Sequence, residues 1–405
     1  MRISTGQMFN QNTSSILQKQ TATNKIMEQL SSRKKVNTAG EDPVAAIGID
    51  NLKQKNALVD QFIRNIDYAT NHIQQAENQL GQADTLVGSM KESMLRGANG
   101  SMTSAERQVI AADMRQSLEQ LMSIANTKDE SGNYIFAGNK TNNAPFAFDN
   151  AGKVLYSGDA GIRKSIIAEG IQVNTNVPGD AAFMKAPHAM GDYGVNYLPS
   201  QQGDFVVTSA KITDTTTHVA DTYTFNFVDD GLGGVNLQVT DSAVPANLVP
   251  TNAASPFDAA LPVRFNSIEV QLKGEPKIGD TFTMAELPQV SIFDTFSKAI
   301  ALFESANDAQ TPAGQSELAQ LLNNIDSGVN QMSQQRSLTG NSLKVLQQYS
   351  DNHSDEKLIN TSALSKLEDL DFASAVTEFE KQQLALNAIS SVFSKVGSTS
   401  LFDYI

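Results

Sequence analysis

The sequence predicts an α+β fold in which the N- and C-terminal segments form a long helical coiled-coil rod, with a central all-β domain inserted between them. Three observations support this fold class. Ten of the 12 prolines of this 405-residue chain lie between Pro145 and Pro288, where they exclude long helices. Both flanks of that window repeat apolar residues at alternating spacings of three and four, the period of a coiled-coil seam. Inside the window, apolar and polar residues alternate as they do in strands.

At about 150 residues per domain, the chain has room for two or three domains. The changes in sequence pattern predict three. Residues 1–44 with 365–405 are expected to pair as a terminal assembly domain that is disordered or only partly ordered in the monomer. Residues 45–144 with 289–364 are expected to form the helical rod, and residues 145–288 a β-rich insert that faces solvent.

The composition excludes several classes of protein. Because the chain has no cysteine, it has no disulfide framework, thiolate zinc site or cysteine nucleophile. Lys+Arg 30 against Asp+Glu 44 gives a net charge of −14, which argues against a nucleic-acid partner. No apolar run approaches the roughly 18 residues of a membrane-spanning helix, so no membrane insertion is expected. The N-terminal segment also lacks the apolar core of a secretory signal peptide.

The longest apolar stripe runs unbroken over Val59–Met94, which is about 50 Å of helix at 1.5 Å per residue. Shorter stripes cover Ile110–Ile124, with Thr103 and Glu106 placed as a capping box before it, and Leu318–Met332. Such a stripe is either a seam of assembly or the buried face of an ordinary helical bundle, and the length of the first one favours a rod. The expected assembly seam consists of Phe9, Ile16, Met27, Leu30, Val59, Phe62, Ile66, Ile73, Leu80, Val87, Met90, Met94, Leu318, Ile325 and Val329.

The two chain ends differ from the rod. The stripe of the N-terminal segment places the polar residues Thr13, Gln20 and Thr23 among four apolar ones. Those four side chains contribute about 6–12 kcal/mol on full burial, whereas ordering some forty residues costs on the order of 40–80 kcal/mol before hydrogen bonds offset part of it. We therefore expect this helix to order only when it pairs with the C-terminal stripe and with neighbouring subunits. The C-terminal stripe consists of Phe372, Phe379, Leu386, Ile389, Phe393 and Val396.

The central window predicts antiparallel strands. Residues 223–227 and 235–239 alternate apolar and polar side chains, and the intervening Asp229–Gly234 segment supplies the turn of a hairpin. A third alternating run covers residues 268–272, before the loop Gly274–Asp280. We expect a small sandwich or barrel.

The sequence offers little for catalysis. Its histidines, none of which has the spacing of a metal site, are His72, His188, His218 and His353. Gly231–Gly234 lacks the third glycine and the following helix of a dinucleotide loop. Asp229 and Asp230 would suit the paired carboxylates of a secreted hydrolase, but an exposed turn explains them better. The basic run Arg33–Lys35 is expected to be a solvated helix end. We predict a protein that is not an enzyme and holds no cofactor or metal, with the hydrolase as an alternative.

Five segments at the ends and borders of the chain carry a resemblance to a known family. They are Met1–Met8, Leu30–Pro43, Gly132–Gly138, Gly274–Phe282 and Ser400–Ile405. They resemble the corresponding segments of the flagellin family, and in particular of the family of flagellar hook-associated protein 3. In the second segment, Asp42 is placed to cap the following helix, and Pro43 to be its first residue.

The resemblance implies a structural role in the bacterial flagellum. Members of this family form a ring that joins the hook, through hook-associated protein 1, to the flagellin filament. They are exported through the type III pathway without a cleaved signal peptide, and an export chaperone holds their C-terminal region, here the Phe372–Val396 stripe. The chain is thus expected outside the cell at the hook–filament junction, as a ring of copies there and a monomer in solution. The alternatives are a flagellin filament subunit and a coiled-coil scaffold kept in the cytoplasm.

Overall fold

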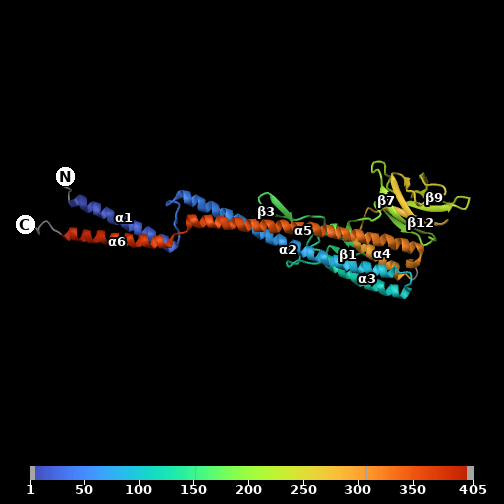
Figure 1. Cartoon of the computed structure of the whole chain (residues 1–405), viewed down its shortest axis with the longest axis horizontal. Helices are drawn as coiled ribbons and strands as arrows, with labels where there is room; N and C mark the ends of the chain where they lie inside the picture. The colour runs from blue at the N-terminus through green and yellow to red at the C-terminus, as the bar shows by residue number, and fades with distance from the viewer. Residues whose placement is uncertain (1–4, 151, 306–307, 399–405) are drawn as a thin grey trace, which may run out of the picture. The chain divides into compact units, whose positions relative to one another are not determined.

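The chain has helices at both ends and its strands between them (Figure 1), which confirms the predicted fold class. The computed structural model describes residues 5–150, 152–305 and 308–398, with the side chains of 7, 9–150, 152–305 and 308–395. The chain divides into two compact units, Met1–Arg64 with Gln348–Ile405, and Asn65–Gln347. Of the segments that carry the family resemblance, Ser400–Ile405 and the first four residues lie outside the described residues.

Long helices make up both flanks of the chain. None of the helices in the described part of the chain is both long and apolar enough to cross a membrane. Their bounds are Thr5–Ser32 (α1), Pro43–Gly97 (α2), Ser104–Ala125 (α3), Ile292–Glu304 (α4), Pro312–Glu368 (α5) and Phe372–Ser398 (α6), with a π-helix at Asp180–Met184 (η1) and a 3-10 helix at Asp308–Gln310 (η2).

Local side chains determine where two of these helices begin. The Asp42 carboxylate accepts hydrogen bonds from two backbone N–H groups of the first turn of α2, at 3.0 and 3.1 Å, and Pro43 is the first residue of that helix. The capping box predicted before α3 is confirmed. Glu106 donates its backbone N–H to the Thr103 hydroxyl, and its carboxylate accepts the Thr103 backbone N–H.

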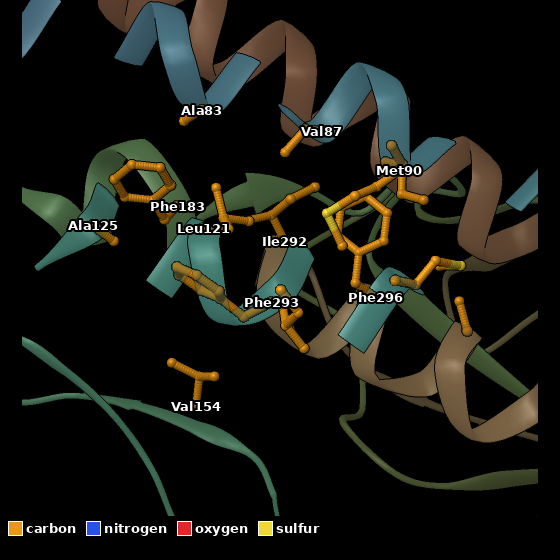
Figure 2. Packing of buried hydrophobic residues seen from close by; sticks show 14 of the residues in the cluster. Ala83, Val87, Met90, Leu121, Ala125, Val154, Phe183, Ile292, Phe293 and Phe296 are labelled. Atoms are coloured by element: carbon orange, nitrogen blue, oxygen red, sulfur yellow. The ribbon is translucent and has the colours of Figure 1, made fainter. Parts of the chain in front are cut away.

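The α2 stripe is a core face. All eleven of its positions from Val59 to Met94 are at most 9 % exposed. In the second unit the stripe packs with apolar residues of α3, α4 and α5 in one cluster, where Figure 2 shows Val87 and Met90 close to Ile292 and Phe296 of α4. Because full burial of one large apolar side chain contributes about 1.5–3 kcal/mol, this cluster is the main source of stability for the second unit.

The strands between α3 and α4 are short and antiparallel. Their bounds are Phe146–Phe148 (β1), Val154–Tyr156 (β2), Lys164–Ala168 (β3), Ile171–Asn174 (β4), Ala186–Pro187 (β5), Tyr193–Tyr197 (β6), Asp204–Ile212 (β7), Tyr223–Asp229 (β8), Val235–Thr240 (β9), Leu248–Val249 (β10), Val263–Phe265 (β11), Ile268–Glu275 (β12), Thr281–Glu286 (β13) and Gln289–Val290 (β14).

Strands β6 to β13 form a sandwich. One sheet has the order β10-β9-β8-β13-β6 and the other β11-β12-β7, and buried residues of both share one core. The predicted hairpin is confirmed, because β8 and β9 pair from Thr224 opposite Thr240 to Asp229 opposite Val235. The aromatic residues of β8 point into the core, where Phe225 stacks on Phe282 of β13 with ring centroids 4.4 Å apart.

The sequence predicts one insert at residues 145–288. In the structure, the first part of this range packs with the helices and the later part forms the sandwich. Phe146, Val154 and Phe183 belong to the helical core. The ring centroids of Phe146 and of Phe293 on α4 are 5.3 Å apart there. The sandwich core begins only at Met190. The physical reason is that a two-stranded hairpin such as β1–β2 has no core of its own and must pack against another element.

Buried polar side chains of α5 attach the sandwich to the helices. Gln320 accepts the backbone N–H of Val195 (3.2 Å) and donates to its carbonyl (3.1 Å), so it pairs with the edge strand β6 as a neighbouring strand would. The Ser316 hydroxyl donates to the carbonyl of Phe205 on β7, and Asn324 accepts the backbone N–H of Ala189. Since each of these bonds is directional, together they fix how the sandwich lies on α5.

The loop Gly274–Phe282, which carries part of the family resemblance, is organised around a buried carboxylate. Asp280 is fully buried, and its carboxylate accepts three backbone N–H groups, from Gln202 (2.7 Å), Gly203 (3.0 Å) and Lys277 (2.7 Å). These bonds satisfy the buried charge and join two loops of the sandwich.

We expect Asp280→Asn to destabilise the sandwich by about 2–3 kcal/mol, because the amide turns one acceptor oxygen into a donor that faces N–H donors. Urea unfolding followed by limited proteolysis of the full chain measures this loss. Asp258→Asn is the matched control, since its exposed carboxylate accepts one backbone N–H, that of Ala260. Equal unfolding midpoints for the two variants would contradict this role for Asp280.

Candidate assembly surface

In the first unit, α1 and α6 pair in antiparallel directions. The rings of Phe9 and Phe393 lie 5.0 Å apart, and Lys19 donates to the side-chain carbonyl of Gln382 at 3.1 Å. The helices α1 and α6 therefore form a terminal hairpin, as their apolar stripes suggested.

The terminal hairpin has almost no core of its own. No described residue of α1 is a buried apolar side chain, and among the described side chains of α6 only Ala375 is one, at 9 % exposed. The second unit buries dozens of apolar residues in its two clusters. Ordering the hairpin costs backbone and side-chain entropy that this little burial does not offset.

The predicted seam residues of the terminal hairpin lie on different faces. Ile16 and Leu30 are half-buried against the pair, whereas Phe9 and Met27 are 55 % and 52 % exposed, and Ile26 occupies the half-buried position beside Met27. On α6, Phe372 is exposed. The half-buried residues there are Phe379, Leu386, Ile389 and Phe393, while the Val396 side chain lies outside the described residues.

Exposed apolar side chains cover the first unit. Single exposed apolar residues are normal in soluble proteins, but a concentration of them on elements without a core indicates an interaction surface. The exposed set, which we call the apolar surface of the first unit, consists of Phe9, Leu17, Met27, Val44, Ile47, Leu58, Leu358, Ile359, Phe372, Leu384 and Val392.

Sequence reasoning found one face of these helices and missed the other. Apolar residues occur as neighbours at Ile16–Leu17, Ile26–Met27 and Val392–Phe393, and in each pair one side chain is half-buried and the other exposed. Adjacent positions on a helix are about 100° apart, so such pairs make the helix apolar on two faces. The paired spacing is the signal that indicates the second face.

The remaining predicted seam residues lie in the interior of the chain. Phe62 stacks on His353 with ring centroids 5.3 Å apart in the first unit, and Val59 is buried. In the second unit Val329 is partly buried. The seam residues that are buried there are Ile66, Ile73, Leu80, Val87, Met90, Met94, Leu318 and Ile325. Side chains buried within one chain offer no surface to another, so they stabilise the chain itself.

A buried carboxylate joins the two helix breaks of the first unit. The chain leaves α1 at Arg33–Lys35 and α5 at Glu368, and the Lys35 N–H donates to the Glu368 carbonyl at 2.7 Å, while the Leu370 N–H donates to the Arg33 carbonyl at 3.1 Å. The Glu368 carboxylate accepts Lys34 at 2.6 Å and Lys53 at 3.0 Å. Hydrogen bonding from Lys34 holds the pKa of Glu368 below its ordinary value. No sequence pattern indicated Glu368, because its partners lie at the other end of the chain.

The polar residues considered for chemistry have structural partners. Asp229 and Asp230 accept backbone N–H groups of their own hairpin turn. His72 lies against the Tyr68 ring, and burial lowers its pKa, while His218 shares a 3.2 Å hydrogen bond with the Tyr193 hydroxyl. Among the described residues, no group of three or more histidine or acidic side chains is placed to hold a metal ion.

Comparison with known proteins agrees with this arrangement. The model of the bacterial flagellin N-terminal helical region matches residues 3–141, and that of the C-terminal helical region matches residues 322–405. The chain belongs to the flagellin family. This is a family of structural flagellar proteins. The N-terminal match contains α1 and the C-terminal match contains α6, the two helices of the terminal hairpin.

Two curated relatives of this flagellin-family chain are named flagellar hook-associated protein 3. The one from Salmonella typhimurium is 34 % identical over 166 residues, or 41 % of this chain and 52 % of the relative. The one from Escherichia coli is 35 % identical over 147 residues, or 36 % and 46 %. The chain thus spans about half the length of these relatives. Flagellin B of Vibrio anguillarum is 33 % identical over 29 % of this chain and 31 % of its own length.

A solved structure covers more of the chain. The crystal structure of flagellar hook-associated protein 3 from Legionella pneumophila is 26 % identical, with a TM-score of 0.67, and the alignment covers 79 % of this chain and 98 % of that one.

We expect Glu368→Gln to loosen the terminal hairpin. Because the folded pKa of Glu368 is lowered, its ion pairs stabilise the hairpin above the ordinary value of 4.5 and are lost as pH falls through the lowered pKa. Hydrogen exchange at the Lys35 and Leu370 amides should become about fivefold faster in the variant at neutral pH, a modest change because the lysines are half-exposed.

The acid-dependent part of that exchange should also disappear in Glu368→Gln, since the amide does not titrate. Glu380→Gln, on the exposed side of α6, serves as the control. Unchanged exchange at Lys35 and Leu370 in the Glu368 variant would show that the carboxylate does not hold the two breaks together.

Proposed function

We propose that this chain is a structural adaptor of the bacterial flagellum that forms the ring between hook and filament. The observation that carries the proposal is the terminal hairpin, which exposes apolar side chains and has almost no core, in a chain whose relatives include hook-associated protein 3. Such a hairpin gains its missing burial from neighbouring subunits.

The expected domains then have separate tasks. Residues 1–44 with 365–405 assemble the ring, residues 45–144 with 289–364 support it, and within residues 145–288 the sandwich strands face outward. The partners are further copies of the chain, hook-associated protein 1 on the hook side and flagellin on the filament side. In solution the chain is a monomer, because its hairpin lacks the neighbours that complete its burial.

The proposal includes the route to that location. The chain is exported through the type III pathway without a cleaved signal peptide, and a chaperone covers α6 beforehand. The exposed Phe372, Leu384 and Val392 support this part, because an apolar helix without a core needs protection in the cytoplasm. No catalytic role is proposed, since Asp229 and Asp230 serve their own turn.

A flagellin filament subunit is the alternative function. Flagellin relatives match a smaller part of this chain than the hook-associated relatives do, 29 % against 41 %. Immunogold electron microscopy of intact flagella, with antibody against residues 190–286, separates the two functions. We expect label in a single band where hook meets filament. Label along the whole filament would establish the flagellin alternative, and absence of label from the flagella would contradict both.

We expect Leu384→Glu to abolish incorporation into the flagellum while leaving the soluble chain folded. Leu384 is 70 % exposed in the single chain, so a helix-favouring polar residue there costs little stability, about 0.5 kcal/mol or less, but it places a charge in the proposed interface. Circular dichroism checks the fold, and quantitative immunogold labelling measures incorporation.

Leu232→Glu is the matched control, because Leu232 is 93 % exposed in the hairpin turn of the sandwich. That variant should incorporate normally. Normal incorporation of Leu384→Glu as well would remove α6 from the proposed interface.

A further inference from the structure

A cavity of about 570 Å³ lies beside α4 in the second unit. It is bounded by the residues before β2, the end of η1, the β5–β14 region, α4 and the N-terminal part of α5. A second hollow of about 370 Å³ shares Gly152, Ser297 and Ala301 with it and continues along α4. The larger cavity has the volume of a site for a small molecule.

One buried donor of this cavity has no partner. His188 lines the cavity and is only 4 % exposed. Its Nδ1 accepts the Met190 backbone N–H at 3.3 Å, so the ring proton is on Nε2, and that atom has no hydrogen-bond partner. Burial lowers the pKa of His188 to about 4, which keeps the ring neutral at physiological pH. A buried donor without an acceptor is costly, so this group calls for an acceptor that a ligand can supply.

A glycine and a partly exposed leucine lie beside this donor. A Cβ at Gly194 would be 3.6 Å from His188 Nε2 and 2.9 Å from Leu287 Cδ2, so both side chains border the space that the glycine leaves. Leu287 is 39 % exposed and lines the cavity. Leu287 therefore borders both the cavity and the space beside Nε2.

Two ammonium groups also border the cavity. Lys153 and Lys298 line it, and neither forms an ion pair within the described residues. Asp294 also lines the cavity, and its carboxylate accepts the Val154 backbone N–H at 3.2 Å. Burial raises the pKa of Asp294, whereas the charges of Lys153 and Lys298 lower it. The three groups are therefore near enough to interact electrostatically. The lining thus carries one more cation than anion.

We propose that this cavity binds a small carboxylic acid that also carries hydroxyl or ammonium groups. The ligand carboxylate accepts hydrogen bonds from Lys153, Lys298 and the His188 ring, and its hydroxyl or ammonium groups donate to the Asp294 carboxylate. The apolar side chains of Met184, Leu287 and Leu321 contact its carbon skeleton. Sugar acids and acidic amino acids share this chemistry, and they differ in the group that faces Asp294.

The test uses the full chain and four probes: glucuronate, glutamate, and their neutral counterparts glucose and glutamine. Calorimetry measures affinity, and NMR of nitrogen-labelled histidine rings reports the site, because the chain has four histidines and His188→Gln identifies one signal. We expect one of the two carboxylates to bind and to shift the His188 ring signal, with no binding of either neutral probe. The carboxylate that binds identifies the source as a sugar acid or an amino acid.

The variant Lys153→Gln with Lys298→Gln should weaken that binding at least tenfold, as expected for the loss of two charged contacts. Lys164→Gln, an exposed lysine of β3 outside the cavity, should bind as the unaltered chain does. Thermal unfolding confirms that the variants fold. Absence of binding by both carboxylates up to about 10 mM, equal binding of the neutral probes, or full affinity in the double lysine variant would each overturn the proposal.

Discussion

The structure depends on the burial of one apolar stripe, that of α2. A helix of this length with one continuous apolar face has no stable state in water until other helices cover that face. The helices that cover it in the second unit include α4 and α5, which come from the other half of the sequence. The helices before and after the central region therefore pack together. The chain between α3 and α4 must start at the helical core and come back to it.

That constraint explains how the central region is divided. The segments β1, β2 and η1, which come before the sandwich in the chain, pack against the helices and contribute Phe146 and Phe183 to the helical core. Only the strands farther along the chain have enough apolar residues to build a second core. The two cores meet at α5, where Gln320 and Ser316 form buried hydrogen bonds to the sandwich backbone. A polar junction of this kind is directional, whereas an apolar contact of equal area tolerates sliding.

The two units differ in how they satisfy their apolar residues, and this difference bears on function. In the second unit the stripes of several helices cover one another within a single chain. In the first unit, α1 and α6 are two helices with apolar residues on more than one face, and a pair of helices covers only one face of each. The electrostatic link through Glu368 fixes where the helices break, but it supplies none of the missing burial. Neighbouring copies provide that burial in the assembly proposed for this chain.

The sequence by itself determined the features that arise from neighbouring residues. The periodicity of α2, the capping box at Thr103, and the β-hairpin whose turn follows Asp229 all depend on side chains within a few positions of one another, so their physics is local. The motifs at Leu30–Pro43 and Gly132–Gly138 indicated the family through their resemblance to its members. Tertiary structure decided the rest. Whether Ile26 or Met27 faces α6 depends on a partner helix, because adjacent apolar residues leave the facing side open. The environments of Glu368, Gln320 and His188 arise from contacts across long stretches of chain, and spacing in the sequence carries no record of such contacts.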